Sequence, residues 1–132
     1  MKKIVYFLGF LTLLTGCDSY TCVEAKIINE SDKDLILQFY HDTLNIRFDI
    51  DSKKEYEIDV LGSGCSIANS GELYLNFYDS IIVKSKDDKI LKVWKQDSSG
   101  RNIYDFENQW LMTSEGKYNF YYTFEILNSD FN

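Results

Sequence analysis

Proline is absent from this sequence, histidine occurs once and cysteine occurs three times. The scarcity of histidine and cysteine limits the catalytic and metal sites that the protein could form. A serine or cysteine nucleophile needs an adjacent base. The only histidine, His41, follows an apolar segment and precedes Asp42, which fits a surface turn better than a catalytic site. A structural zinc ion usually takes four ligands, for which these residues are too few. We therefore expect a non-enzymatic protein with no metal site and no cofactor.

Basic residues are scarce relative to acidic ones. Lysine and arginine number 14 against 21 aspartate and glutamate residues, which gives a net charge of −7. A protein of this charge repels phosphate backbones and anionic lipid headgroups. The composition thus argues against nucleic acid as a partner.

Long hydrophobic runs are also missing. The apolar run at residues 4–14 follows a basic start at residues 1–3 and ends at Gly16, directly before polar residues. A membrane-spanning helix needs about 20 apolar residues, so this run is too short to stay in a bilayer. A basic start, an apolar middle and a small-residue end are the features of a secretory signal peptide.

The end of this run has the order Leu14, Thr15, Gly16, Cys17. Small residues before a cysteine, at the end of an apolar core, resemble the lipobox of bacterial lipoproteins processed by signal peptidase II. The resemblance implies cleavage between Gly16 and Cys17 and attachment of a diacylglyceryl group, with palmitate-type chains, to the Cys17 thiol. One acyl chain anchors a protein only reversibly, whereas two or three make the attachment effectively permanent. The alternative is an ordinary signal peptide with a chance cysteine at its end.

These signals divide the chain into a signal peptide at residues 1–16, a short lipidated tether at residues 17–20 and a single domain at residues 21–132. We expect a protein of the cell envelope that is held at a lipid bilayer by acylated Cys17. Asp18 resembles an inner-membrane retention signal in some lineages and accompanies surface export in others. We favour the outer membrane or the cell surface over the inner membrane.

Two thiols remain once Cys17 is acylated. Cys22 and Cys65 form an even pair in an oxidising compartment, which predicts one disulfide. Closing a loop of some forty residues contributes roughly 4 kcal/mol in the chain-entropy model. The alternative is two free buried thiols that serve as small hydrophobic side chains.

Beyond the tether, short stretches of alternating apolar and polar residues are typical of β-strands. The stretches are residues 23–28, 35–40, 44–50, 56–60, 73–77, 81–83, 90–94 and 118–126. The stretches at 81–83 and 90–94 flank a tight turn and should form a hairpin. Residues 103–111 suit either a short helical turn, which we favour, or a strand.

Strands at this spacing predict an all-β domain. We expect an antiparallel β-sandwich, immunoglobulin-like or similar, of about 7–9 strands after the signal helix, with a small β-barrel as the alternative. Because proline is one of the residues that protect exposed strand edges, its absence leaves this role to charges. Lys26, Arg47 and Lys84 are the candidates for it.

A second resemblance lies near the carboxyl end. The order Arg101, Asn102, Ile103, Tyr104, followed by Trp110 and the aromatic strand at residues 118–126, looks like small uncharacterised envelope lipoproteins built mainly of β-strands. The resemblance implies an all-β fold and carries no activity.

Two groups of side chains are candidates for a functional site. Acidic residues between positions 49 and 59 could meet across a hairpin, as the paired carboxylates of glycoside hydrolases do, or bind calcium or a basic partner. Their alternation with apolar residues instead predicts a solvated face. Exposed aromatic rings offer rigid contact area, and the predicted binding residues are Tyr74, Tyr78, Trp94 and Trp110. The alternative for these rings is a second packed layer inside the sandwich.

The sequence therefore predicts a membrane-tethered β-sandwich that binds another envelope component, an envelope protein first and a glycan second. Two other functions stay open. One is a small glycan-active hydrolase that uses an acidic pair, and the other is a structural or immunity-type lipoprotein that blocks a partner.

Overall fold

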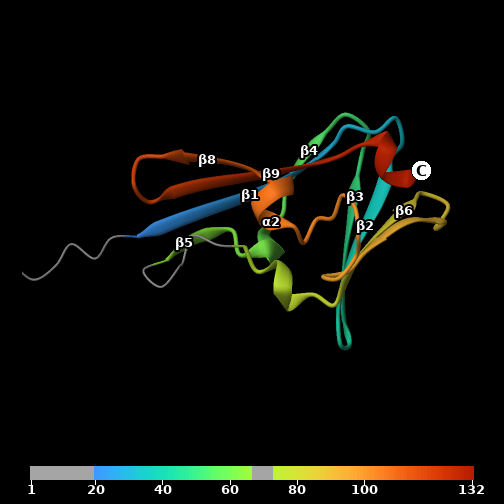
Figure 1. Ribbon diagram of the computed structural model, residues 1–132, viewed down its shortest axis with the longest axis horizontal. Helices are drawn as coiled ribbons and strands as arrows, with labels where there is room; N and C mark the ends of the chain where they lie inside the picture. Colours follow the sequence, from blue (N-terminus) through green and yellow to red (C-terminus); the bar gives the residue numbers. More distant parts are fainter. Residues whose placement is uncertain (1–19, 67–72) are drawn as a thin grey trace, which may run out of the picture.

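Two β-sheets form the framework of the computed structural model, which describes residues 20–66 and 73–132 (Figure 1). The first sheet has the order β4–β1–β9–β8, and β5 also pairs with β1. Its strands are β1 (Thr21–Asn29), β4 (Glu55–Glu57), β5 (Gly64–Ser66), β8 (Leu111–Glu115) and β9 (Asn119–Ile126). The second sheet, β3–β2–β6–β7, consists of β2 (Leu35–His41), β3 (Leu44–Ile50), β6 (Ser80–Ser85) and β7 (Ile90–Trp94). The predicted all-β sandwich is confirmed, and within the described residues neither sheet closes on itself.

The first sheet is not wholly antiparallel, so this part of the prediction is wrong. β1 and β9 come from opposite ends of the domain and run parallel, with Val23 opposite Phe120 and Ile27 opposite Phe124. They lie side by side in Figure 1. The error has a physical cause. The alternation of apolar and polar residues determines which face of a strand is buried, but the pattern is the same in both chain directions. It therefore does not distinguish parallel from antiparallel pairing.

The core lies between the two sheets. β1 and β9 bury alternate residues, as the period-two pattern predicts. The largest fully buried side chains are Trp94, Phe39, Phe124, Ile27, Leu35, Ile36, Leu37, Ile50, Ile58, Leu61, Ile81 and Ile103. Phe124 meets Trp94 edge to face, with 5.6 Å between the ring centroids. Aromatic packing of this kind stabilises a core beyond the burial of area alone.

The predicted hairpin of β6 and β7 is confirmed, with Ile81 opposite Trp94. Two other predicted strands are shorter or absent. The stretch at residues 56–60 gives only the short strand β4, followed by the 3₁₀ helix η2 (Asp59–Leu61), and the stretch at 73–77 contains the 3₁₀ helix η3 (Leu75–Phe77). Around η3, Leu75 and Tyr78 are the buried residues. A spacing of three suits a 3₁₀ turn, and a short run cannot distinguish it from a strand.

The segment at residues 103–111 contains the favoured helical turn, α2 (Phe106–Gln109). After Trp110, strand β8 begins at Leu111; this strand was not predicted from the sequence. All five residues of β8 are exposed, so burial imposes no alternating pattern on its sequence. The last helical element is the 3₁₀ helix η4 (Asn128–Phe131).

Arg101 links the carboxyl-terminal segment to the core through an ion pair and a cation–π contact. Its Nη1 lies 2.6 Å from Oδ2 of buried Asp130, and its guanidinium carbon lies 4.6 Å from the centre of the Phe124 ring. The same Asp130 oxygen accepts the backbone N–H of Leu127 at 2.8 Å. The backbone carbonyl of Arg101 in turn accepts the indole N–H of Trp94 at 3.1 Å. Arg101 therefore forms a structural clasp between the core and the carboxyl-terminal segment.

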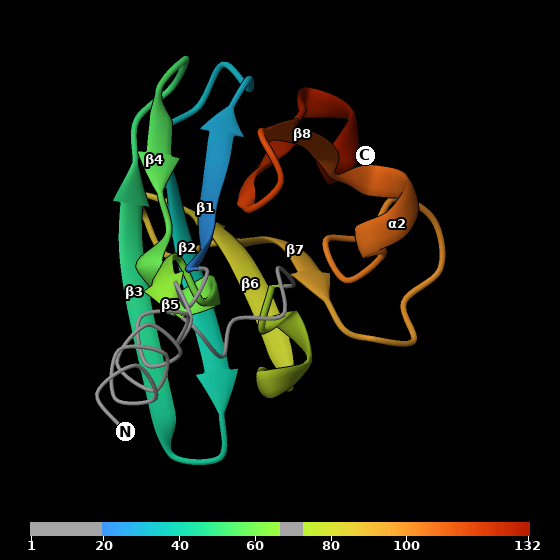
Figure 2. The same cartoon turned by 90° about the vertical axis from the view of Figure 1, so that its left-hand side faces the viewer.

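One end of the first sheet extends past the second sheet (Figure 1), and Figure 2 views the molecule from that end. We call this end the overhang; it comprises Thr21, Cys22, β5, β8, the turn at residues 116–118 and the start of β9. Its residues are half-buried or exposed, in contrast to the buried middle of β1 and β9. In the described residues the overhang therefore lacks the packing that stabilises the rest of the sandwich, and it contains the surfaces considered next.

Candidate functional sites

The predicted lipidation and cleavage residues, Cys17 and Gly16, lie outside the described residues. The described chain starts at Tyr20, whose side chain is 59% exposed, and β1 follows at once. The lipid-attachment segment therefore leads directly into the overhang.

The predicted disulfide is present in the overhang. Cys22 of β1 and Cys65 of β5 are bonded, and they lie opposite each other in the β1–β5 register. β5 has only three residues, and all of them are exposed. Because so short a strand buries little surface, the covalent bond takes the place of packing in holding β5 against β1.

Three of the four predicted binding aromatics are not on the surface. Tyr78, Trp94 and Trp110 are buried in the core. Each directs its polar atom to a backbone carbonyl: the Tyr78 hydroxyl donates to Val60 at 2.9 Å and the Trp110 indole to Ile103 at 2.7 Å. A buried tyrosine or tryptophan is stable when its polar atom has such a partner. These three rings therefore belong to the packed layer, which was the alternative interpretation.

The fourth, Tyr74, is on the surface, with 55% of its side chain exposed. Tyr74 and the exposed Phe77 line a hollow of about 490 Å³, together with Val60, Leu73, Asn76 and Tyr78. We call this hollow the aromatic groove. The Phe77 ring also packs on His41, with 4.1 Å between the ring centroids. His41 thus ends β2 as a half-exposed aromatic neighbour of the groove.

Two of the acidic residues singled out in the sequence, Asp49 and Glu55, lie on strands beside basic residues. On β3, Asp49 is 3.4 Å from the nitrogens of both Arg47 and Lys86. The hydrogen bond from Arg47 lowers the pKa of this carboxyl below its usual value. On β4, Glu55 lies 3.8 Å from Lys26. Ion pairs of this kind are typical of a solvated charged face.

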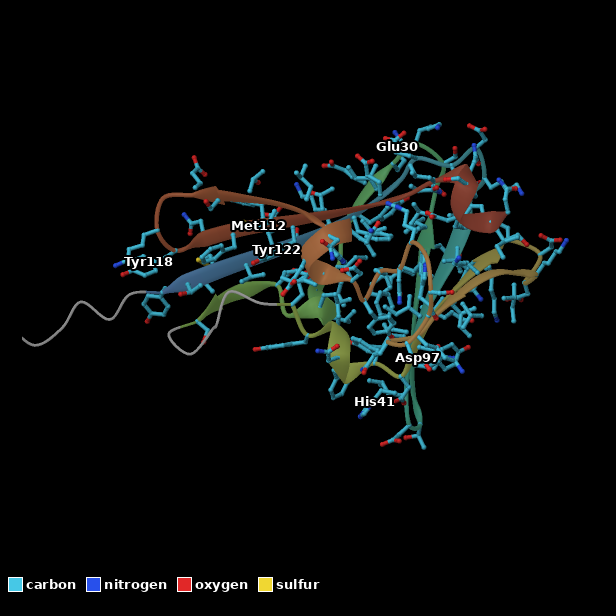
Figure 3. The ribbon with its side chains drawn as sticks, in the orientation of Figure 1. Glu30, His41, Asp97, Met112, Tyr118 and Tyr122 are labelled. Atoms are coloured by element: carbon cyan, nitrogen blue, oxygen red, sulfur yellow. A yellow bond between two sulfur atoms is a disulfide. The ribbon has the colours of Figure 1, made fainter. Side chains whose placement is uncertain are left out.

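The missed strand β8 is the least protected edge of the described sheets. Leu111 is 64% exposed and Met112 is 53% exposed, and the strand carries no charge before Glu115 at its end. Its register with β9 places Met112 opposite buried Tyr122 (Figure 3). We call residues 111–115 the β8 edge.

The other edges differ from the β8 edge. β3 carries Arg47 and Asp49, β7 pairs with β6 through an irregular register between Val83 and Lys84, and β4 and β5 have three residues each. Charges, irregularities and short length all discourage pairing with another chain. Of the three predicted edge charges, only Arg47 lies on an edge; Lys26 and Lys84 are on the inner strands β1 and β6. In the sequence, two consecutive apolar residues, Leu111 and Met112, with no proline or charge beside them, were the signal that could have identified this unprotected edge.

Two phenols near these surfaces remain neutral well into the alkaline range. Burial raises the pKa of Tyr104, whose hydroxyl donates to the backbone carbonyl of Tyr78 at 2.9 Å. The hydrogen bond to Glu115 raises the pKa of Tyr121 on β9. Both hydroxyls therefore act as hydrogen-bond donors at neutral pH.

Within the described residues, no three side chains of histidine, cysteine, aspartate or glutamate gather as metal ligands do. No helix in the described part of the chain has the length and apolarity needed to cross a bilayer.

The leader, which ends in a small residue and a cysteine, indicates an exported protein, and the described domain that follows is all-β. The comparison with known families makes this specific: residues 1–17 match the prokaryotic membrane lipoprotein lipid attachment site. This match supports a lipid anchor on Cys17 and a location in the cell envelope. No curated protein and no solved structure matches the chain.

Proposed function

We propose that this lipoprotein is a non-enzymatic binding module that holds an extended segment of another envelope protein against the β8 edge. The observation that carries the proposal is the exposure of Leu111 and Met112 on an uncharged edge strand. An edge strand presents unpaired backbone N–H and C=O groups, and an extended peptide adds to such an edge by main-chain hydrogen bonds.

Side chains at the β8 edge supply apolar contacts on both faces. Met112 points to the same face as Tyr122 and Phe120, whereas Leu111 and Thr113 point to the opposite face, next to Thr123 and Tyr121. An added strand with two consecutive apolar residues would place one of them against Leu111 on one face and the other against Met112 on the opposite face. Each well-buried apolar side chain contributes about 1.5–3 kcal/mol. The partner we expect is therefore an exposed, extended segment with apolar residues.

The test is site-specific photo-crosslinking in cells that make the full lipoprotein. A photoreactive residue at Met112 should give a discrete adduct with one envelope protein. The matched control position is Ile90, which is also an exposed apolar residue on an edge strand, β7. Leu111→Lys should abolish the adduct at Met112, because a lysine on an edge opposes strand addition. An adduct at Met112 that is no stronger than at Ile90, or one that survives Leu111→Lys, contradicts the proposal.

A glycan ligand is the second candidate, and the aromatic groove favours it. Exposed rings beside a hollow suit the apolar faces of sugars, and Tyr74 and Phe77 present two such rings. If a glycan is the ligand, Tyr74→Ser should abolish co-sedimentation with purified peptidoglycan, whereas Leu111→Lys should leave it unchanged. An envelope protein remains our first proposal, with the outer membrane or cell surface as its location.

A further inference from the structure

The overhang is the part of the domain nearest to the lipid anchor. Consecutive Cα atoms are 3.80 Å apart, so three steps from Cys17 place the Cα atom of Tyr20 within about 11 Å whatever the conformation between them. β1 begins one residue later. The end of the domain that bears Tyr20 is therefore held close to the bilayer surface, within about 11 Å of the acylated residue.

A second segment reaches this same end. The turn at residues 116–118 joins β8 to β9, and the backbone carbonyl of Tyr118 accepts the N–H of Cys22 at 2.7 Å. Figure 3 places Tyr118 at the end of the molecule from which β1 starts, and the β6–β7 turn lies at the opposite end in Figure 1. Tyr118 is 36% exposed, and the Lys117 ammonium lies 5.1 Å from the centre of its ring.

The side chains at this end suit a bilayer interface. Tyrosine concentrates at the headgroup level of membranes, because its ring is apolar and its hydroxyl stays hydrated. A lysine beside it extends its amine to lipid phosphates. The rest of the domain is strongly acidic, and an acidic body is repelled from anionic headgroups. Contact is thus favoured at Tyr20, Lys117 and Tyr118, whereas the net negative charge of the domain as a whole opposes it.

We propose that Tyr20 and the turn Gly116–Lys117–Tyr118 insert into the headgroup region of the bilayer that holds the lipid anchor. The contact fixes the orientation of the domain: the overhang faces the membrane, and the β6–β7 turn points away from it. The anchor becomes a three-point contact rather than a loose tether. This inference rests on the lipid anchor and is independent of what the β8 edge binds.

Fluorescence quenching of the full lipidated protein in vesicles tests the proposal. The probe vesicles contain phosphatidylcholine and phosphatidylglycerol with brominated acyl chains, and matched vesicles lack bromine. Tyr118→Trp is the reporter at the overhang, and Ile90→Trp, at the base of the β6–β7 turn, is the control at the opposite end. Buried Trp94 and Trp110 give a background that the parent protein measures. Tyr20→Trp is a second reporter that alters no strand.

We expect bromine to reduce the added emission of Tyr118→Trp about twofold and that of Ile90→Trp very little, as a ring at the interface requires. Adding Lys117→Glu to Tyr118→Trp should lower the quenching in vesicles rich in phosphatidylglycerol. Flotation with the vesicles verifies anchoring, and circular dichroism verifies the fold. If Tyr118→Trp and Tyr20→Trp are both quenched no more than Ile90→Trp, the proposed orientation is wrong. Loss of the Met112 adduct would not affect this result, so the two proposals fail separately.

Discussion

Loss of the Cys22–Cys65 disulfide should loosen the overhang before it unfolds the core. The bond joins β1 to the three-residue strand β5, in the part of the first sheet that extends past the second sheet. The buried middle of β1, including Ala25 and Ile27, keeps its packing without the bond. The effect should therefore be graded along β1, with its start affected most.

The magnitude follows from the length of the closed loop. The two cysteines are 43 residues apart, and a loop of this length gives about 4 kcal/mol in the chain-entropy model. Domains of ordinary size have a free energy of unfolding of roughly 5–15 kcal/mol. The domain without the disulfide should thus remain folded but lose a large share of its stability.

Urea denaturation of the double variant Cys22→Ala/Cys65→Ala against the parent protein measures this loss. Reducing agent should destabilise the parent to a similar extent and leave the double variant unchanged, which provides the matched control. Hydrogen exchange adds spatial detail: amides of β5, β8 and the start of β1 should exchange faster, whereas those of β2 and β6 should stay protected.

Two outcomes would refute the reasoning. A loss below about 1 kcal/mol would mean that the unfolded chain is not constrained by the loop as the entropy argument requires. Equal acceleration of exchange in β2 and in β5 would mean that the overhang and the core open as one unit.

Three further predictions concern the Arg101–Asp130 ion pair, the hydroxyl group of Tyr104, and the rings of Trp110 and Tyr74. Asp130→Ala should lower the free energy of unfolding by about 3 kcal/mol in thermal melts, because it leaves the partly buried Arg101 charge without its partner; a loss under 1 kcal/mol would mean that water replaces the pair. The raised pKa of Tyr104 means that the folded state keeps its proton while the unfolded chain loses it above about pH 10. Stability should therefore fall as the pH rises through that range, and Tyr104→Phe should flatten the slope; an unchanged slope would contradict the assignment. Trp110→Ala should lower the free energy of unfolding by about 3–5 kcal/mol, because this ring is buried. Tyr74→Ser should change the free energy of unfolding by less than about 0.5 kcal/mol, because this ring is exposed. Equal effects of the two substitutions would show that the burial of these rings has been misassigned.

Strand positions could be predicted where burial imposes a pattern. The last strand shows this best: alternation over residues 118–126 predicted β9, which buries Tyr122, Phe124 and Ile126. Strand β8 could not be predicted in this way, because none of its side chains is buried. The candidate site on the β8 edge was therefore invisible to periodicity, and only the absence of proline and of charge pointed to it.

The surface position predicted for the four candidate aromatic residues was wrong for three of them, for a related reason. Composition supplies many rings but does not say which of them find a carbonyl partner inside the domain. Trp94 and Trp110 do, through the backbone carbonyls of Arg101 and Ile103, and are buried. Tyr74 is exposed beside η3. Which ring is buried depends on the path of the loops between the strands, and that path is not encoded in any local pattern.

By itself the sequence determined the leader, the lipid-attachment site and the all-β class, because each depends on local order. Simple counting also predicted the pairing of Cys22 with Cys65, but two free thiols remained the alternative until the structure showed the bond. The tertiary structure alone decided that β1 and β9 run parallel, which residues form the overhang, and that the 116–118 turn reaches the start of β1. Strand direction and the meeting of distant segments result from long-range packing, for which a chain of alternating residues carries no local signal.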